Sequence, residues 1–161
     1  MLLKVERALD AGGEATSAAD WVGRLAAMYR GWAQRRHMQL HEIRGKSPGD
    51  AVIFQIAGFG AFRALAGEAG LHVLECEDGE SDRRIVARVS VAAGSLEDPP
   101  AAEAYRHFSA LLAHATPGAV VRRYREEPSP LVRDSRQGWR TGRLDLVLRG
   151  DFDFAGAIRE A

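Results

Sequence analysis

The sequence lacks the features that mark secreted and membrane proteins. It has one cysteine, Cys76, in 161 residues, so no intrachain disulfide can form, and a lone thiol is typical of a reducing cytoplasm. The opening MLLKVERALD contains no apolar run long enough for a signal peptide, and no window approaches the roughly 18 apolar residues of a membrane helix. We therefore expect a cytoplasmic protein with no membrane partner, folded as one domain over residues 1–161.

The chain also lacks a net charge. It has 22 lysines and arginines against 22 aspartates and glutamates, so its formal charge at pH 7 is zero. This balance argues against attraction to nucleic acid by the molecule as a whole, and we expect no DNA partner. A local basic patch is still compatible with it.

Motifs for catalysis and cofactor binding are missing as well. The sequence contains no G-x-S-x-G motif, P-loop or dinucleotide fingerprint. Of its five histidines, only His37 and His41 stand at ligand spacing, and they straddle a predicted change from helix to strand. Cys76 has acidic neighbours, which disfavour the thiolate form that a nucleophile needs. We expect no cofactor, no metal and no enzymatic activity.

Apolar periodicity predicts an α+β fold. A strand and a helix come first, then several strands, then a helix, a strand and a helical end, which argues for a mixed or largely antiparallel sheet packed by helices. The expected strands are 2–7, 39–45, 51–58, 71–75, 83–93 and 120–127, and the expected helices are 17–36, a short one within 59–70, 101–115 and one or two within 144–161. The acidic stretch 75–82 and the polar segment 128–143 are expected to be loops.

The first predicted helix, residues 17–36, has one strongly apolar face. Its large apolar residues recur at i, i+4, i+7 and i+11, so they share one side of the helix. We expect this side to pack on a sheet that includes 51–57 and 85–92. The residues of the stripe are Trp21, Leu25, Met28 and Trp32.

Arginine is concentrated in residues 122–143. Seven arginines lie there against three carboxylates, with Tyr124 and Trp139 between them. Guanidinium groups and aromatic planes are side chains that contact RNA, so this region is a candidate RNA-binding surface. A solvated strand and loop paired with the acidic stretch 75–82 explains the composition equally well. The candidate residues are Arg122, Arg123, Arg125, Arg133, Arg136, Arg140 and Arg143.

Strand alternation limits how many of these arginines can share one surface. It places Arg123 and Arg125 on one face of the predicted strand, and Arg122 and Tyr124 on the other. The strand can therefore give only part of its charge to any surface, and the following loop must supply the rest. If the region faces RNA, we expect five arginines to be largely exposed and to lie on one side of the protein. They are Arg122, Arg125, Arg133, Arg136 and Arg140.

Two blocks of the sequence resemble the codon-recognition half of bacterial class I peptide chain release factors. The first block holds AGGEATSAADW, MYRGWAQRR and SPGDAVIFQIAGFGAFRALAGEAGLH, followed by RRIVARVSV. The second block is VVRRYREEPSPLVRDSRQGWRTGRLDLVLRGDFD. They stand in the family's order and cover about two-thirds of the chain. The resemblance implies a release-factor-like α+β domain.

Differences from the family imply that the chemistry of release is absent. The family's catalytic module carries Gly-Gly-Gln between the two blocks, whereas this chain has no Gly-Gly-Gln and holds a linker and helix over 95–118. The family's tripeptide anticodon belongs where this chain has the acidic stretch 75–82, whose carboxylates would repel mRNA phosphates. The family's codon-stacking histidine follows paired arginines, and here Arg83 and Arg84 are followed by Ile85. The family's leading helical domain is not in the sequence.

Two hypotheses follow from these observations. The first is a non-catalytic, translation-associated protein that contacts the ribosome and its rRNA, or a release-factor partner, through the arginine-rich region. The second is a binding module that kept the same scaffold for a non-ribosomal protein or small ligand.

Overall fold

The computed structural model describes residues 1–8, 15–46, 51–78, 81–94, 101–113 and 118–153. The helices are α1 (Ala15–Arg35), α2 (Ala61–Leu65), α3 (Ala101–Ala113) and α4 (Leu144–Leu148), with a 3-10 turn, η1 (Ala66–Glu68). The strands are β1 (Leu2–Arg7), β2 (Gln39–Arg44), β3 (Val52–Ala57), β4 (Gly70–Asp78), β5 (Ser81–Ala92), β6 (Val120–Arg125), β7 (Leu131–Asp134) and β8 (Arg140–Thr141).

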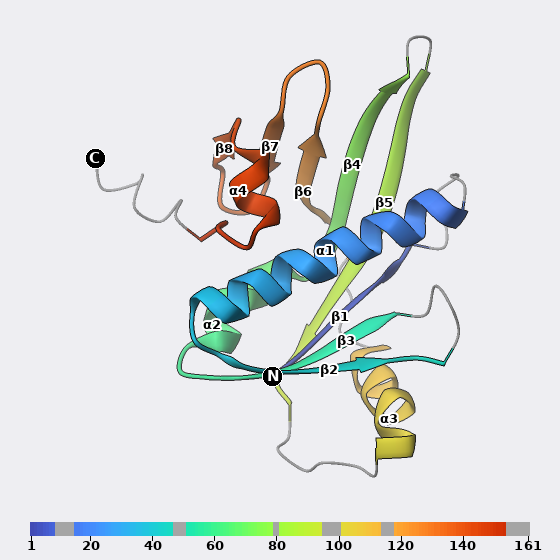
Figure 1. The fold of residues 1–161 in the computed structure, drawn as a ribbon, viewed down its shortest axis with the longest axis vertical. Helices are drawn as coiled ribbons and strands as arrows, with labels where there is room; N and C mark the ends of the chain where they lie inside the picture. The colour runs from blue at the N-terminus through green and yellow to red at the C-terminus, as the bar shows by residue number, and fades with distance from the viewer. Residues whose placement is uncertain (9–14, 47–50, 79–80, 95–100, 114–117, 154–161) are drawn as a thin grey trace.

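Over these residues the strands form one sheet in the order β2-β3-β1-β5-β4-β6-β7-β8 (Figure 1). Neighbouring strands are antiparallel except β4 and β6, which run parallel because the chain between β5 and β6, with α3 in it, crosses over to the far side of β4. The sequence-based expectation of an α+β fold with a mixed, largely antiparallel sheet is confirmed.

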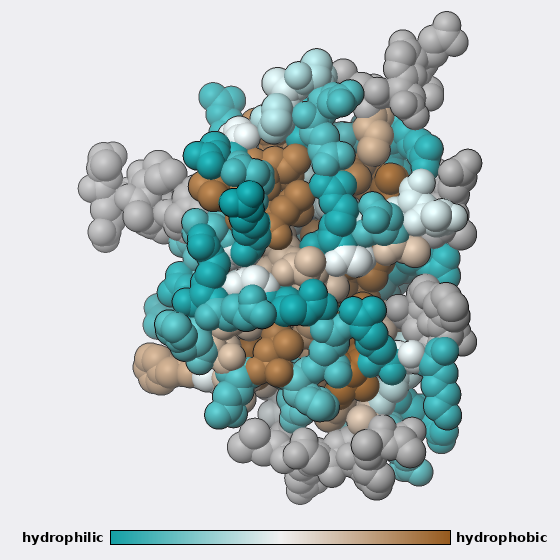
Figure 2. Space-filling view, in the orientation of Figure 1, coloured by the Kyte–Doolittle hydropathy of each residue, from teal (hydrophilic) through white to brown (hydrophobic). Residues whose placement is uncertain are grey.

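Helix α1 lies across one face of the sheet (Figure 1). Its apolar stripe is fully buried: Trp21 is 0% exposed and Trp32 is 1% exposed. The stripe joins a core that includes Phe54 of β3 and Val89 of β5, so the predicted packing of this helix is confirmed. The outward side of α1 is polar, and Figure 2 shows hydrophilic residues in a band across the middle of this face.

The opposite face of the sheet carries a smaller core beneath α3. Phe108 and Leu112 of α3 are buried against Leu2 of β1 and Ile53 of β3. These two strand residues alternate with Leu3 and the other side chains that face α1, as the two-residue period of a strand requires. The helices therefore cover the two faces unequally, and α3 packs mainly on the β2-β3-β1-β5 part of the sheet.

The acidic stretch 75–82, predicted to be a loop, is largely strand. β4 continues to Asp78 and β5 begins at Ser81, and these two residues are paired in register. Part of the acidic stretch meets basic residues of β5, since Glu75 lies opposite Arg84, whereas Glu77 lies opposite Asp82. Opposite charges on facing positions stabilise a pair of strands, so a run of carboxylates need not end one.

The polar segment 128–143, also predicted to be a loop, contains the β7–β8 hairpin. The strands have four and two residues, too short for their alternation to stand out in the sequence. α4 follows β8 and packs on α1 and β7. Within the described residues, no helix combines the length and the apolar character needed to span a membrane. The expected linker over 95–100 and any helix beyond Asp153 lie outside the described residues.

Candidate nucleic-acid interface

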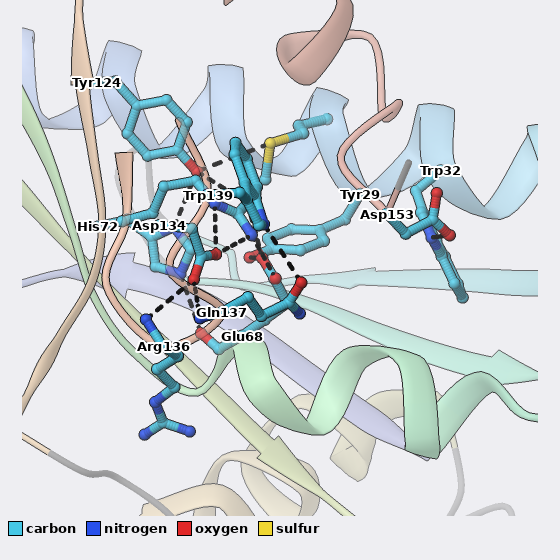
Figure 3. Close-up of polar contacts among 12 residues, drawn as sticks. Tyr29, Trp32, Glu68, His72, Tyr124, Asp134, Arg136, Gln137, Trp139 and Asp153 are labelled. Carbon is cyan, nitrogen blue, oxygen red and sulfur yellow. Dashed lines mark hydrogen bonds and ion pairs between the residues drawn. The ribbon is translucent and has the colours of Figure 1, made fainter. Parts of the chain in front are cut away.

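Arg122 of β6 is the centre of a buried ionic cluster, whose carboxylates, Glu68 and Asp134, are labelled in Figure 3. The residue is 0% exposed. Its Nη2 and Nη1 atoms donate to Oε1 and Oε2 of Glu68 at 2.7 and 3.1 Å. Its Nε and Nη2 atoms donate to Oδ2 of Asp134 at 3.1 and 2.9 Å. Both carboxylates are buried, so the guanidinium is held by two forked contacts in a low-dielectric environment, where such bonds are strong.

Aromatic side chains enclose this cluster. The Arg122 guanidinium carbon lies 5.1 Å from the ring centre of Trp139 and 5.0 Å from that of Phe152. The hydroxyl of Tyr29 on α1 donates to Oε2 of Glu68 at 2.9 Å. Burial and the nearby Glu68 carboxylate raise the Tyr29 pKa well above its ordinary value, so the phenol stays a donor. The network thus joins α1, η1 and β6.

His72 of β4 connects the cluster to a second hydroxyl. Its Nε2 lies 2.9 Å from the carbonyl oxygen of Glu68, which can only accept, so Nε2 carries the ring proton. Nδ1 then accepts from the Tyr124 hydroxyl at 3.0 Å. Burial is the main cause that lowers the His72 pKa from 6.5 to about 4, with Arg122 adding to it and Glu68 opposing it, so the ring is neutral at pH 7. These two hydrogen bonds fix the tautomer of His72 and give both of its ring nitrogens a partner.

Asp134 also organises the turn between β7 and β8. Its Oδ1 accepts the backbone N–H groups of Arg136 and Gln137 at 3.0 and 2.7 Å, which is the bonding of an Asx turn. The Gln137 side chain accepts from the Trp139 indole at 3.2 Å. The same carboxylate therefore holds Arg122 inside the protein and shapes the exposed turn that presents Arg136.

Arg123 and Arg125 lie on the opposite face of β6 from Arg122 and Tyr124, as strand alternation predicted. Arg123 is half-buried and pairs with Glu75 at 3.4 Å. Arg125 donates to the carbonyl and hydroxyl oxygens of Ser129, both at 3.2 Å. These two arginines are partly engaged within the protein.

Three arginines of the hairpin are exposed: Arg133, Arg136 and Arg140. Arg133 and Arg140 lie directly opposite each other on β7 and β8. Within the described residues, none of the three forms a salt bridge, whereas Arg143 pairs with Asp145 at 3.0 Å. Like charges at facing strand positions repel, so this pair is the least compensated charge of the region.

The structure therefore divides the seven candidate arginines. The expectation that Arg122 is exposed is wrong: alternation turns it into the core, where Glu68 and Asp134 neutralise it. The three hairpin arginines are exposed as expected, while Arg125 is only half-exposed. Arg122 is therefore not available to RNA, and RNA binding by the other six arginines remains a prediction.

Sequence reasoning missed Glu68, His72 and Tyr29 as members of this network. They come from η1, β4 and α1, and no local spacing connects them. The sequence held one indirect signal. An arginine on the core side of a strand, as Arg122 proved to be, needs buried carboxylates as partners. Within the described residues, no group of three or more possible metal ligands comes together.

The family model described as the PCRF domain matches residues 3–85, more than half of the chain. The chain belongs to the PCRF domain family. This match covers β1 to the start of β5 and ends before the arginine-rich region, and it confirms the resemblance to peptide chain release factors.

Two proteins place this member of the PCRF domain family among its relatives. Peptide chain release factor 2 of Roseobacter denitrificans is 32% identical over 71 residues, which cover 41% of this chain and 19% of that relative's length. The solved structure of release factor 2 of Thermus thermophilus superposes with a TM-score of 0.62 at 19% identity, over 98% of this chain and 65% of that one. The chain thus matches a part of each relative, and the second match extends the shared fold through β6, β7 and β8.

Proposed function

We propose that this PCRF-domain protein is a non-catalytic, translation-associated protein that binds the ribosome through Arg133, Arg136 and Arg140. The observation that carries the proposal is the facing pair Arg133 and Arg140, both exposed and without an ionic partner among the described residues. Facing like charges on neighbouring strands destabilise a sheet unless an anion lies between or above them. RNA phosphates are anions of the right kind, because a guanidinium can bind a phosphate through two hydrogen bonds.

The sequence between β5 and β6 supports the non-catalytic part of the proposal. The resemblance places the family's Gly-Gly-Gln module there, and this sequence contains no Gly-Gly-Gln. Its residues in that place include α3, which packs on the sheet through Phe108 and Leu112. A helix docked on the sheet in this way does not supply the water-positioning glutamine that the family's hydrolysis requires.

The β4–β5 hairpin supports the part of the proposal in which the protein contacts the ribosome without reading a stop codon. The family's tripeptide anticodon belongs at this place, which here holds residues 75–82 with five carboxylates. Carboxylates repel the phosphates of mRNA, so this end of the hairpin disfavours codon contact. Ribosome binding would then be independent of the codon in the decoding site.

Co-sedimentation with ribosomes across a salt series tests the proposal. Binding should weaken steeply with salt, and the double variant Arg133→Ala, Arg136→Ala should flatten the slope of log affinity by roughly 0.7 to 0.9 per lost phosphate contact. The control is Arg63→Ala, which removes an exposed arginine of α2, outside the hairpin. The two variants and the wild-type chain should unfold at the same urea concentration.

Two outcomes would contradict the proposal. One is a wild-type chain that does not sediment with ribosomes even at low salt. The other is a double variant that sediments as well as wild type and shows the same salt slope, because the hairpin arginines would then make no ionic contact.

A further inference from the structure

The face of the sheet opposite α1 is only partly covered. α3 packs on this face over β1, β2, β3 and β5, and its apolar cluster holds Leu2 and Ile53 with the partly buried Ala92 of β5. Further along the sheet, the side chains that point to the same side include Arg84 and Arg133, and both are exposed. Within the part of the chain that the structure describes, this part of the face, from β5 to β8, carries exposed arginine side chains.

Strand registers show that arginines from different strands share this part of the face. On β5, Arg84 and Arg88 lie opposite Glu75 and Leu71 of β4. On the other side of β4, Glu75 lies opposite Arg125 of β6. Facing positions of paired strands project to the same side of a sheet.

The same rule extends the row to the edge of the sheet. Arg123 of β6 lies opposite Arg133 of β7, which lies opposite Arg140 of β8. We call the resulting set the arginine face: Arg84, Arg88, Arg123, Arg125, Arg133 and Arg140.

Among the residues whose side chains are described, two carboxylates lie on or beside this face, and the register continues beyond Glu75 to Glu77, which lies opposite Asp82. Glu75 lies within the arginine face and pairs with Arg123. Glu6 of β1 lies opposite Arg88 at the border of the face and pairs with Lys4 at 3.0 Å. Among the described side chains, arginines therefore outnumber carboxylates on this face, and a locally basic surface attracts a polyanion.

We propose that the arginine face binds the sugar-phosphate backbone of double-helical RNA. The inference rests on the proposed ribosome binding and names the form of RNA that the surface takes. From β5 to β8 the row crosses four strand intervals, roughly 20 Å at about 4.8 Å per interval, which allows contact with several phosphates of one backbone.

The side chains between the arginines distinguish a duplex from a single strand. They are aliphatic: Leu71, Val73, Val86 and Leu131. Proteins that hold single strands stack the bases on aromatic rings, whereas RNA duplexes are bound through backbone and shape. The two aromatic residues of the arginine-rich region do not serve this face. Tyr124 is fully buried on the α1 side, and Trp139 packs over the buried Arg122 guanidinium.

Fluorescence anisotropy of the full chain tests this inference. The probes are a labelled RNA duplex of about 16 base pairs with an arbitrary sequence, and one of its strands alone. The duplex should bind at least tenfold more tightly than the strand at equal salt. The double variant Arg84→Gln, Arg140→Gln should lose roughly tenfold affinity per arginine at about 0.1 M salt and flatten the salt slope by about 0.9 per arginine. Arg63→Gln, the matched control, should bind as wild type does.

The outcomes separate this inference from the proposed function. Equal affinity for duplex and single strand, or a double variant that binds duplex like wild type, overturns the arginine face even if the chain sediments with ribosomes. A chain that binds duplex as expected but does not sediment with ribosomes overturns the proposed function and leaves the arginine face in place. Loss of duplex binding in the Arg63→Gln control would also contradict the inference, because the contact would then not be confined to this face.

Discussion

At the scale of single residues, the central feature is a buried arginine with two carboxylate partners. Removing two charges from water is costly, and a buried ion pair is often no more stable than a well-packed apolar replacement. Breaking one is different, because the remaining charge is left without compensation. Arg122 is held by both Glu68 and Asp134, so loss of the arginine leaves two neighbouring buried carboxylates.

We expect Arg122→Met to lower the free energy of unfolding by about 3–5 kcal/mol. Adding Glu68→Gln to this variant should recover part of the loss, because it removes one of the two uncompensated charges. Urea denaturation followed by fluorescence measures both effects. Asp145→Ala, which breaks the exposed pair with Arg143, is the control and should leave stability unchanged. An Arg122→Met variant as stable as wild type would show that the cluster is not needed for the fold.

Because His72 is buried as a neutral ring, we expect the protein to lose stability in acid. Its pKa is about 4 in the folded chain and 6.5 in the unfolded one, so the unfolded state binds more protons between these values. Stability from this group is complete above pH 6.5 and falls as the pH drops toward 4, by about 2 kcal/mol at pH 5. Urea denaturation above pH 6.5 and at pH 5 measures this loss of stability. His72→Gln should lose this component of the pH dependence, and an unchanged slope in the variant would contradict the assignment.

At the scale of elements, the contact between α1 and the end of α4 depends on two glycines. A Cβ atom at Gly31 of α1 would lie 2.4 Å from the carbonyl oxygen of Arg149. Across the contact, Gly150 has φ of +91°, and a Cβ there would lie 2.1 Å from the backbone nitrogen of Trp32. The two backbones approach so closely that neither position has room for a side chain.

Two glycine-to-alanine changes on α1 should therefore have opposite signs. Gly31→Ala forces α4 away from α1 and should destabilise the protein by about 1–3 kcal/mol, as overpacking does. Gly23 is exposed with open space around it, so Gly23→Ala should stabilise the helix by about 0.5–1 kcal/mol. Thermal and urea denaturation of the two variants measure both changes in stability. Equal effects of both changes would mean that α4 does not dock as closely as described.

At the scale of the whole molecule, the two faces of the sheet differ in what they contribute to stability and to the proposed binding. The α1 face holds the main core and the Arg122 cluster, while the other face carries α3 at one part and the arginine face at the other. Changes to the exposed arginines should therefore alter binding and leave stability intact, and changes to the cluster should do the reverse.

We expect the purified chain to release no peptide from ribosomes programmed with any of the stop codons. The sequence has no Gly-Gly-Gln, and residues 75–82 are acidic where the family reads the codon. A peptide-release assay measures this, with a full-length release factor as the positive control and buffer as the baseline. Codon-dependent release above the buffer baseline would contradict the proposal that the protein is non-catalytic.

The sequence by itself determined the parts that rest on periodicity and on continuous motifs. The stripe from Trp21 to Trp32 sets the buried side of α1, and the strands 2–7, 39–45, 51–58 and 120–127 appear within two residues of their predicted bounds. Both signals are local, because a helix or strand repeats its buried side at a fixed spacing.

The tertiary structure decided which face of each strand is buried and what the charges do there. Alternation put Arg122 and Arg123 on opposite faces, but only the packing of α1 and the arrival of Glu68 from η1 made one face the core. Likewise, only the pairing of β4 with β5 brings Arg84 opposite Glu75. Energies of charged groups depend on burial and on partners distant in the chain, so no local pattern could assign them.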